Sequence, residues 1–279
     1  MADISKINSV AIANISKLAG RTLADGDKVF GKSKPSSGGT PNAFLSKVSN
    51  WGSGYGTHPV NWETLDNTHI VHGSQAVTRK WTADSGGKTP SGGTGPTDGH
   101  DSTQGYTSGD GREGSSSDYM FTEASGHSNK HFMLRTPELD LSTALANNTL
   151  KLYFWFHMYG SNINSTAALG VAATDSSTSA ADDTLGLHFT SETEGGGTIV
   201  YWDDNSDDGS STASGVRIGG QQQTQGNGNT STDAHWRLGY VDLNSVAGQS
   251  SVYIWFYSKT GSSFRSDVCI DDVEVIGEV

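Results

Sequence analysis

One stretch of the chain, Thr149 to Gly160, constrains the fold more than any other. It reads TLKLYFWFHMYG, and a second stretch, Ser250 to Ser258 (SSVYIWFYS), has the same apolar and aromatic character. Aromatic and β-branched side chains favour packed strands, and the short lengths and the flanking Gly160 and Gly261 argue against the alternative, a buried helix. Because the alternation fades in the middle of the first stretch, we expect it to be buried on both faces. These two strands are predicted to form the hydrophobic centre.

The remaining sequence is typical of an all-β protein with long polar loops. Glycine accounts for 36 of the 279 residues, and Ser, Thr, Asn and Asp occur in long runs. Further short strands are predicted at Thr184 to Ser191, Thr198 to Trp202 and Gly215 to Gly219. The segments between them, DDNSDDGSS and GGQQQTQGNGNTS, are predicted to be exposed loops. For the amides of Gln221 to Gln223 we favour a solvated loop over glycan binding.

The chain is acidic. Eighteen Lys and Arg residues against 30 Asp and Glu residues give a formal net charge of −12. An acidic surface repels phosphate, which argues against nucleic acid and anionic membranes as partners. The carboxylates either serve solubility or, in acidic loops, hold a hard cation such as calcium.

A single cysteine, Cys269, leaves no intramolecular disulfide, so folding needs no oxidising compartment. It lies in an apolar run and is predicted to be a core residue rather than a nucleophile. The N-terminal sequence lacks a basic region followed by a long apolar segment. We therefore expect no signal peptide, no membrane insertion and folding in the cytoplasm.

The first 25 residues contain an eleven-residue repeat. Ile4 to Asn14 reads ISKINSVAIAN, and Ile15 to Asp25 reads ISKLAGRTLAD. Turn-like pairs at Asn8-Ser9 and Ala19-Gly20 favour short β-hairpins over a right-handed helical coiled coil, which can share this period. Such hairpins bury little surface. Residues 1–25 are therefore either an arm that docks on another protein or another copy, or a hairpin packed on its own domain.

Residues 26–59 are rich in Gly, Ser, Lys and Pro and are predicted to be a linker or an extended arm. Apolar residues within this segment indicate that parts of it pack on the domain. They are Phe44, Leu45, Val48, Trp51 and Tyr55.

Seven motifs follow in order from residue 60 to about residue 277. They are Asn61-Trp62-Glu63, DSGGKTPSGGTGP at 84–96, YMFTEAS at 119–125, FMLRTPELDL at 132–141, LKLYFWFHMYG at 150–160, Val241-Asp242-Leu243 and IDDV at 270–273. In order and character they resemble a MAM domain, the adhesive β-sandwich module of animal cell-surface proteins. The resemblance implies an antiparallel two-sheet jelly-roll sandwich over residues 60–279. Animal MAM domains carry disulfides and this chain has none, so receptor-type homophilic adhesion is not carried over.

The first 25 residues also resemble the ISKIN-type openings of structural proteins of marine tailed phages. This resemblance implies a non-enzymatic virion protein that folds in the host cytoplasm and displays an adhesive sandwich. It would be a capsid decoration or a tail or fibre component, present as a homo-oligomer or in many copies. Its expected partners are other virion proteins, through residues 1–25, and a host-surface glycan or protein. The alternative is a glycan-active enzyme or carbohydrate-binding module of the depolymerase kind on the same sandwich.

Residues for catalysis are sparse, and we predict no catalytic site. The nine histidines show no HExxH spacing, and the chain contains no GxSxG, P-loop or CxxC pattern. His157 in the central strand is expected to be a core residue rather than a ligand. For the glycan-active alternative, the candidate acid–base pair is Glu123 and Glu138, because glycoside cleavage uses two carboxyl groups.

A structural calcium site is the one constellation that we predict. In MAM-like and related jelly-roll folds the first and last strands lie close together, so the resemblance implies that a cation can clamp the two chain ends. The candidate ligands are Glu63 on the opening strand, Asp98 and Asp101 in an acidic loop, and Asp271 and Asp272 on the closing strand. Calcium prefers carboxylate and carbonyl oxygens, and an acidic pair in an apolar strand is costly unless it is paired or bound to a metal. The alternative is that one of the two aspartates points to water.

Overall fold

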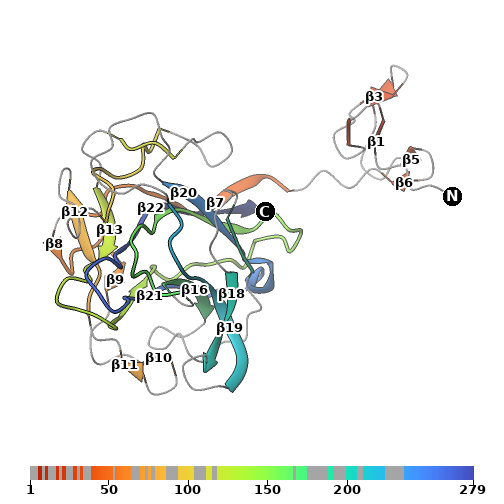
Figure 1. Ribbon diagram of the computed structural model, residues 1–279. Helices are drawn as coiled ribbons and strands as arrows, with labels where there is room; N and C mark the ends of the chain where they lie inside the picture. Colours follow the sequence, from red (N-terminus) through yellow and green to blue (C-terminus); the bar gives the residue numbers. More distant parts are fainter. Residues whose placement is uncertain are drawn as a thin grey trace.

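The protein is a sandwich of two antiparallel sheets (Figure 1), which confirms the predicted all-β fold. The computed structural model describes residues 39–52, 54–64, 70–72, 75–76, 79–85, 94–103, 111–114, 118–165, 168–174, 188–191, 199–205, 210–223 and 236–279, and the backbone of six short strands between residues 6 and 33. The larger sheet has the order β17 (His188–Ser191), β20 (Arg237–Asp242), β15 (Lys151–His157), β22 (Val268–Glu278), β13 (Asp118–Thr122), β12 (Thr82–Ser85) and β8 (Gly54–Tyr55), with β7 (Pro41–Val48) also paired to β22. The smaller sheet has the order β18 (Ile199–Asn205), β19 (Ser210–Ile218), β16 (Leu169–Thr174), β21 (Tyr253–Lys259), β14 (His131–Arg135) and β9 (Glu63–Thr64). A separate hairpin pairs β10 (Ile70–His72) with β11 (Gln75–Ala76).

The strands predicted between residues 184 and 219 are present with different bounds. β17 covers the second half of its predicted range, whereas β18 and β19 extend toward each other. Asp203 pairs with Ala213 and Asn205 with Ser210, so part of the segment predicted as an exposed loop is strand. Among the described residues the one helical turn is the 3-10 turn η2 (Asn244–Val246), and none of them forms a helix that could cross a membrane.

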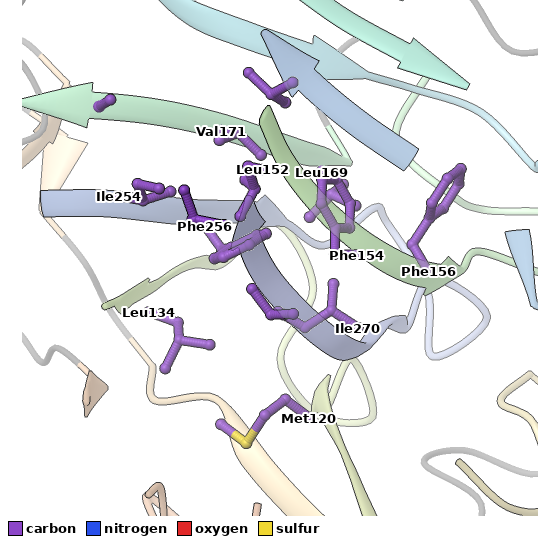
Figure 2. Close-up of a cluster of buried hydrophobic side chains, with 14 of the residues drawn as sticks. Met120, Leu134, Leu152, Phe154, Phe156, Leu169, Val171, Ile254, Phe256 and Ile270 are labelled. Carbon is purple, nitrogen blue, oxygen red and sulfur yellow. The ribbon is translucent and has the colours of Figure 1, made fainter. Parts of the chain in front are cut away.

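The two apolar stretches predicted to form the centre are the strands β15 and β21, one in each sheet. They face each other across the sandwich, where the ring centroids of Phe154 and Phe256 lie 5.2 Å apart at an interplanar angle of 86°. Aromatic pairs favour this edge-to-face arrangement. Figure 2 shows both rings in the buried cluster, with side chains from several other strands of both sheets around them.

The other face of β15 is buried as well, as predicted. Trp155 belongs to a second buried cluster, with Tyr119, Phe121, Trp236, Leu238 and Cys269. Gly111 lies over this cluster with a φ of +70°, and a Cβ at this position would come within 2.0 Å of the Trp236 carbonyl oxygen. A loop therefore covers the outer face of the larger sheet at this point, and only glycine lets it approach so closely.

The N-terminal repeat forms hairpins, as predicted. β1 (Lys6–Ile7) pairs with β2 (Val10–Ala11), and β3 (Lys17–Leu18) pairs with β4 (Arg21–Thr22). A third hairpin of the same register, β5 (Lys28–Val29) with β6 (Lys32–Ser33), extends the eleven-residue period into the segment predicted as a linker. All described pairings of these six strands stay within their own hairpins.

The segment predicted as a linker also supplies a strand of the sandwich. β7 pairs with the C-terminal half of β22, from Val273 opposite Val48 to Glu278 opposite Pro41. Phe44, Leu45 and Val48 pack against the main core, and Trp51 is fully buried in it, as the apolar residues of this segment indicated. The sandwich therefore begins near residue 40 rather than at residue 60.

Candidate functional site

Asp271 and Asp272 lie at a bulge in β22. Tyr153 of β15 pairs with Glu274, whereas Trp155 pairs with Asp271, so β22 holds one extra residue between these pairs. Asp272 takes a positive φ of 47°, which Asp tolerates better than most residues. Consecutive side chains of a regular strand point to opposite faces, but a bulge re-aims them. Both aspartates can therefore reach one residue, His100.

Both carboxylates are buried, with 0% of Asp271 and 2% of Asp272 exposed. Asp271 accepts hydrogen bonds from Trp51 Nε1 at 2.9 Å, from the backbone N–H of Asp272 at 2.7 Å and from the backbone N–H of His100 at 2.8 Å. His100 Nδ1 lies 2.8 Å from Asp272 Oδ2, and the imidazole stacks on Trp155 with the ring centroids 3.8 Å apart. The alternative that one aspartate points to water is therefore wrong.

Two features of this acidic pair call for a proton or a cation. Burial raises the pKa of Asp271 well above its ordinary value, and the charge of Asp272 raises it further, against the hydrogen bonds from Trp51, Asp272 and His100. Asp272 Oδ1 is buried and has no hydrogen-bond partner among the described residues. A buried, unpaired carboxylate oxygen is costly, and either a shared proton or a bound cation would lower that cost.

The structure does not bring the five predicted calcium ligands together. Glu63 lies in the smaller sheet, where Arg135 Nη2 donates a hydrogen bond to its Oε2 at 2.6 Å. Asp101 Oδ1 accepts hydrogen bonds from the backbone and hydroxyl of Thr103. The Asp98 carbonyl oxygen accepts one from Trp236 Nε1. Over the described part of the chain, no three His, Cys, Asp or Glu side chains are placed to hold a metal ion. The predicted set of five ligands therefore does not fit a calcium ion. Of the five, only Asp271 and Asp272 lie next to each other.

Glu63 instead belongs to an open pocket on the smaller sheet, which we call the Arg135 pocket. Its volume is about 660 Å³, and it is lined by His58, Asn61, Trp62, Glu63, Arg135, Pro137, Glu138 and Tyr253. Glu63 of β9 and Arg135 of β14 are direct cross-strand partners, which places their side chains side by side. The turn before β9 contains Asn61 with a φ of 68° and a hydrogen bond from the Trp62 N–H to the Pro59 carbonyl.

The side chains of β21 alternate between the main core and the face of the sheet that carries Arg135. Ile254 and Phe256 point into the main core, so Tyr253 and Trp255 lie on the opposite face with Arg135. The Arg135 guanidinium carbon lies 4.9 Å from the centroid of the Tyr253 ring and 5.8 Å from that of Trp255. Such cation–π contacts hold the guanidinium in place.

Glu138 also lines the pocket, and it is an exposed residue. The pKa of the Tyr253 phenol is raised by partial burial and then by the charge of Glu138 and its hydrogen bonding to the phenol, while Arg135 acts in the opposite direction. The pocket thus holds one ion pair, Glu63 with Arg135, and a second carboxylate, Glu138, near the Tyr253 phenol.

Several other predicted sites have different roles in the structure. Glu123 does not line the Arg135 pocket, and its Oε1 accepts a hydrogen bond from the Ser125 N–H. His157 is fully buried, as predicted for a core residue. Gln222 and Gln223 are buried, so the prediction of a solvated loop is wrong for them. Gln223 bonds through Oε1 to the Met158 N–H and through Nε2 to the Phe156 carbonyl, which satisfies the end of β15.

Sequence reasoning missed Trp51, His100, Arg135 and Tyr253 as members of these sites. For Tyr253 a signal existed, because it alternates with the core residues Ile254 and Phe256. The other three are brought in by contacts between segments far apart in the sequence, such as Trp51 with Asp271.

The comparisons with known proteins do not assign the chain to a family. No family model matches it, and no curated protein matches it. Solved structures that match include the K1 cleaved adhesin domain of the Lys-gingipain of Porphyromonas gingivalis, at 17% identity and a TM-score of 0.34, covering 84% of this chain and 95% of that chain. The K3 cleaved adhesin domain of the same protein matches at 14% identity and a TM-score of 0.34, covering 82% and 98%. Such weak likeness supports no inference about function.

Proposed function

We propose that this chain is a non-enzymatic virion structural protein that displays an adhesive β-sandwich, as a capsid decoration or as a tail or fibre component. The observation that carries the proposal is the division of the chain. In the part of the chain that the structure describes, the six strands between residues 6 and 33 pair only within their own hairpins, whereas the chain from Pro41 onward forms a sandwich with its own core. The hairpin segment is the docking arm, and the sandwich is the displayed part.

The resemblances found in the sequence support the same division. The ISKIN-type opening resembles phage structural proteins over the hairpin segment, and the MAM-like motifs lie within the sandwich. Attachment in many copies would give weak contacts of the sandwich a high combined affinity for a host surface.

Truncation at the boundary that the structure gives tests this proposal. Deletion of residues 1–36 removes all three hairpins and leaves β7 in place. The shortened protein should keep the melting temperature of the sandwich but should no longer enter the particle. Deletion of residues 1–50 is the control for the boundary, because it also removes β7 and should destabilise the sheet. Normal assembly of the protein that lacks residues 1–36 would contradict the docking role.

The alternative, a glycan-active enzyme, has one supporting observation: Glu63 and Glu138 line the same pocket. Glu63 is ion-paired with Arg135 at 2.6 Å, which supports a binding role over proton transfer. Incubation of the protein with oligosaccharides, followed by chromatography of the products, distinguishes an enzyme from a binding module. Cleavage that Glu138→Gln abolishes would establish the enzyme, whereas binding of an oligosaccharide without cleavage supports the binding module.

For calcium, the proposal is narrowed to Asp271 and Asp272. Its support is the buried Asp272 Oδ1 without a hydrogen-bond partner among the described residues. A cation there would neutralise the acidic pair. A chelator and added calcium test this proposal through the melting temperature.

A further inference from the structure

We propose that the Arg135 pocket is a binding subsite for a neutral, polyhydroxylated ligand, a saccharide unit without charged substituents. The inference rests on the proposed display function and gives the sandwich a defined contact with a host surface. It is carried by the arrangement of donors and acceptors in the pocket, by its size and by its rigidity.

The pocket is lined by both donors and acceptors of hydrogen bonds. Glu63 and Glu138 carry acceptor oxygens, and Arg135, which is paired with Glu63, carries donor N–H groups. The Asn61 amide, which also lines the pocket, offers both. A sugar hydroxyl donates and accepts at the same time, so neighbouring hydroxyls of one ring can engage both kinds of group.

Charged ligands fit the same arrangement less well. An anion, such as a uronate or a sulfated sugar, would approach Arg135 but would meet the carboxylates of Glu63 and Glu138. A cation, such as a lysine side chain, would use these carboxylates but would meet the Arg135 guanidinium, which already neutralises Glu63 at 2.6 Å. Like charges brought together in a partly desolvated pocket cost binding free energy. A neutral ligand with hydroxyl groups avoids both conflicts.

The dimensions and the rim of the pocket also fit a saccharide. The volume of about 660 Å³ lies within the usual range of small-ligand pockets. Pro137, which also lines the pocket, offers apolar surface beside the polar groups. The aromatic ring of Tyr253 lies in the pocket wall. Sugars combine hydroxyl edges with apolar C–H faces. The polar residues of the pocket can bind the hydroxyl edges, and its apolar residues can contact the C–H faces.

The pocket is preorganised, because its central groups are fixed before a ligand binds. Arg135 is held by its ion pair with Glu63 and by the rings of Tyr253 and Trp255, and its side chain is only 15% exposed. These residues lie on or beside paired strands, which hold a site more firmly than free loops do, and a rigid site loses less entropy on binding.

The test is calorimetric titration of the full chain with defined probes. These are neutral gluco-, manno- and galacto-oligosaccharides, an oligogalacturonate as the anionic probe and a lysine-rich peptide as the cationic probe. We expect saturable binding of at least one neutral oligosaccharide and weaker or no binding of the two charged probes. Preferred binding of a charged probe, or no binding of any neutral oligosaccharide at millimolar concentration, would overturn the proposal.

Substitutions locate the binding. Glu138→Gln replaces a charged acceptor at the pocket, and Tyr253→Phe removes a hydroxyl from a residue that lines it; each should weaken binding roughly tenfold or more. Tyr240→Phe is the matched control, because Tyr240 also lies under a cation, Lys151 at 4.5 Å, but on β20 of the other sheet. Equal affinity in all three variants would place the sugar elsewhere and refute the assignment. Particle incorporation is measured separately. If the wild-type protein enters the particle normally but binds no neutral oligosaccharide, this inference is overturned and the proposed function stands.

Discussion

Trp51 and Asp271 are joined by a hydrogen bond of 2.9 Å between the indole Nε1 and the carboxylate Oδ1, although 220 positions separate them in the sequence. Both side chains are fully buried. Trp51 follows β7, and Asp271 marks the bulge of β22 just before the residues that pair with β7. The bond therefore ties the start of the sandwich to its last strand, which is the role that we had predicted for a calcium ion.

Trp51→Phe should lower the free energy of unfolding by about 1–3 kcal/mol beyond the loss of packing, because a hydrogen bond to a buried carboxylate disappears. Trp81→Phe is the matched control: Trp81 is equally buried in the same core, and its Nε1 has no hydrogen-bond partner among the described residues. Urea denaturation of both variants measures the difference. Equal losses in the two variants would show that the bond contributes nothing measurable to stability.

The raised pKa of Asp271 predicts a specific pH dependence in the metal-free protein. An unfolded aspartate titrates near about pH 3.9, and below that pH both states hold the proton. As the pH rises toward the higher pKa of the folded state, the folded protein holds the proton that the unfolded chain has lost, so the free energy of unfolding falls. Asp272→Asn removes the neighbouring charge and should make this fall shallower. Urea denaturation in chelator from about pH 4 to about pH 8 measures both slopes, and equal slopes would contradict the coupling of the two acids.

Gln223 should be important for stability although it lies in a polar, glycine-rich segment. Its amide satisfies the Met158 N–H at 2.6 Å and the Phe156 carbonyl at 2.9 Å. Gln223→Ala should cost about 1–3 kcal/mol for each buried backbone group left unpaired. Gln221→Ala is the control, because Gln221 is exposed and its only hydrogen bond among those described is a long one, 3.3 Å, from the Gly160 N–H. Thermal melting of the two variants checks the difference, and similar small losses would show that water replaces the Gln223 amide.

Much of the fold could be predicted from local pattern. The apolar density of β15 and β21 and the turn pairs of the first two hairpins are properties of short stretches, and local signals are sufficient for them. β7 was missed because its sequence, PNAFLSKV, sits among Gly, Ser and Pro residues and its burial depends on β22. The third hairpin was missed because its sequence keeps the register but, of the aligned apolar positions of the first two, only Val29.

The candidate sites were less predictable because they depend on long-range pairing. Glu63, Arg135 and Tyr253 come from three strands, and only the register of β9 with β14 and of β14 with β21 brings them together. The acidic pair was found from the sequence, since two aspartates in an apolar strand need partners. The predicted loop from Asp98 to Asp101 does adjoin the pair, through His100. Trp51 could not be predicted as a partner, because it comes from a segment without a recognisable motif.

The narrowed calcium proposal predicts how the melting temperature responds to calcium, and Asp272→Asn tests this response. If a cation binds Asp271 and Asp272, calcium should stabilise the wild-type protein by RT ln(1 + [L]/Kd), about 2.7 kcal/mol at a hundredfold excess over Kd, and a chelator should lower the melting temperature. Asp272→Asn should abolish this response, whereas Asp140→Asn, at an exposed aspartate, should leave it intact. If the pair is satisfied by Trp51, His100 and a proton instead, neither calcium nor chelator will shift the melting curve. Asp272→Asn should then change the melting temperature by the same amount with and without calcium, and the calcium proposal would be withdrawn while the fold stands.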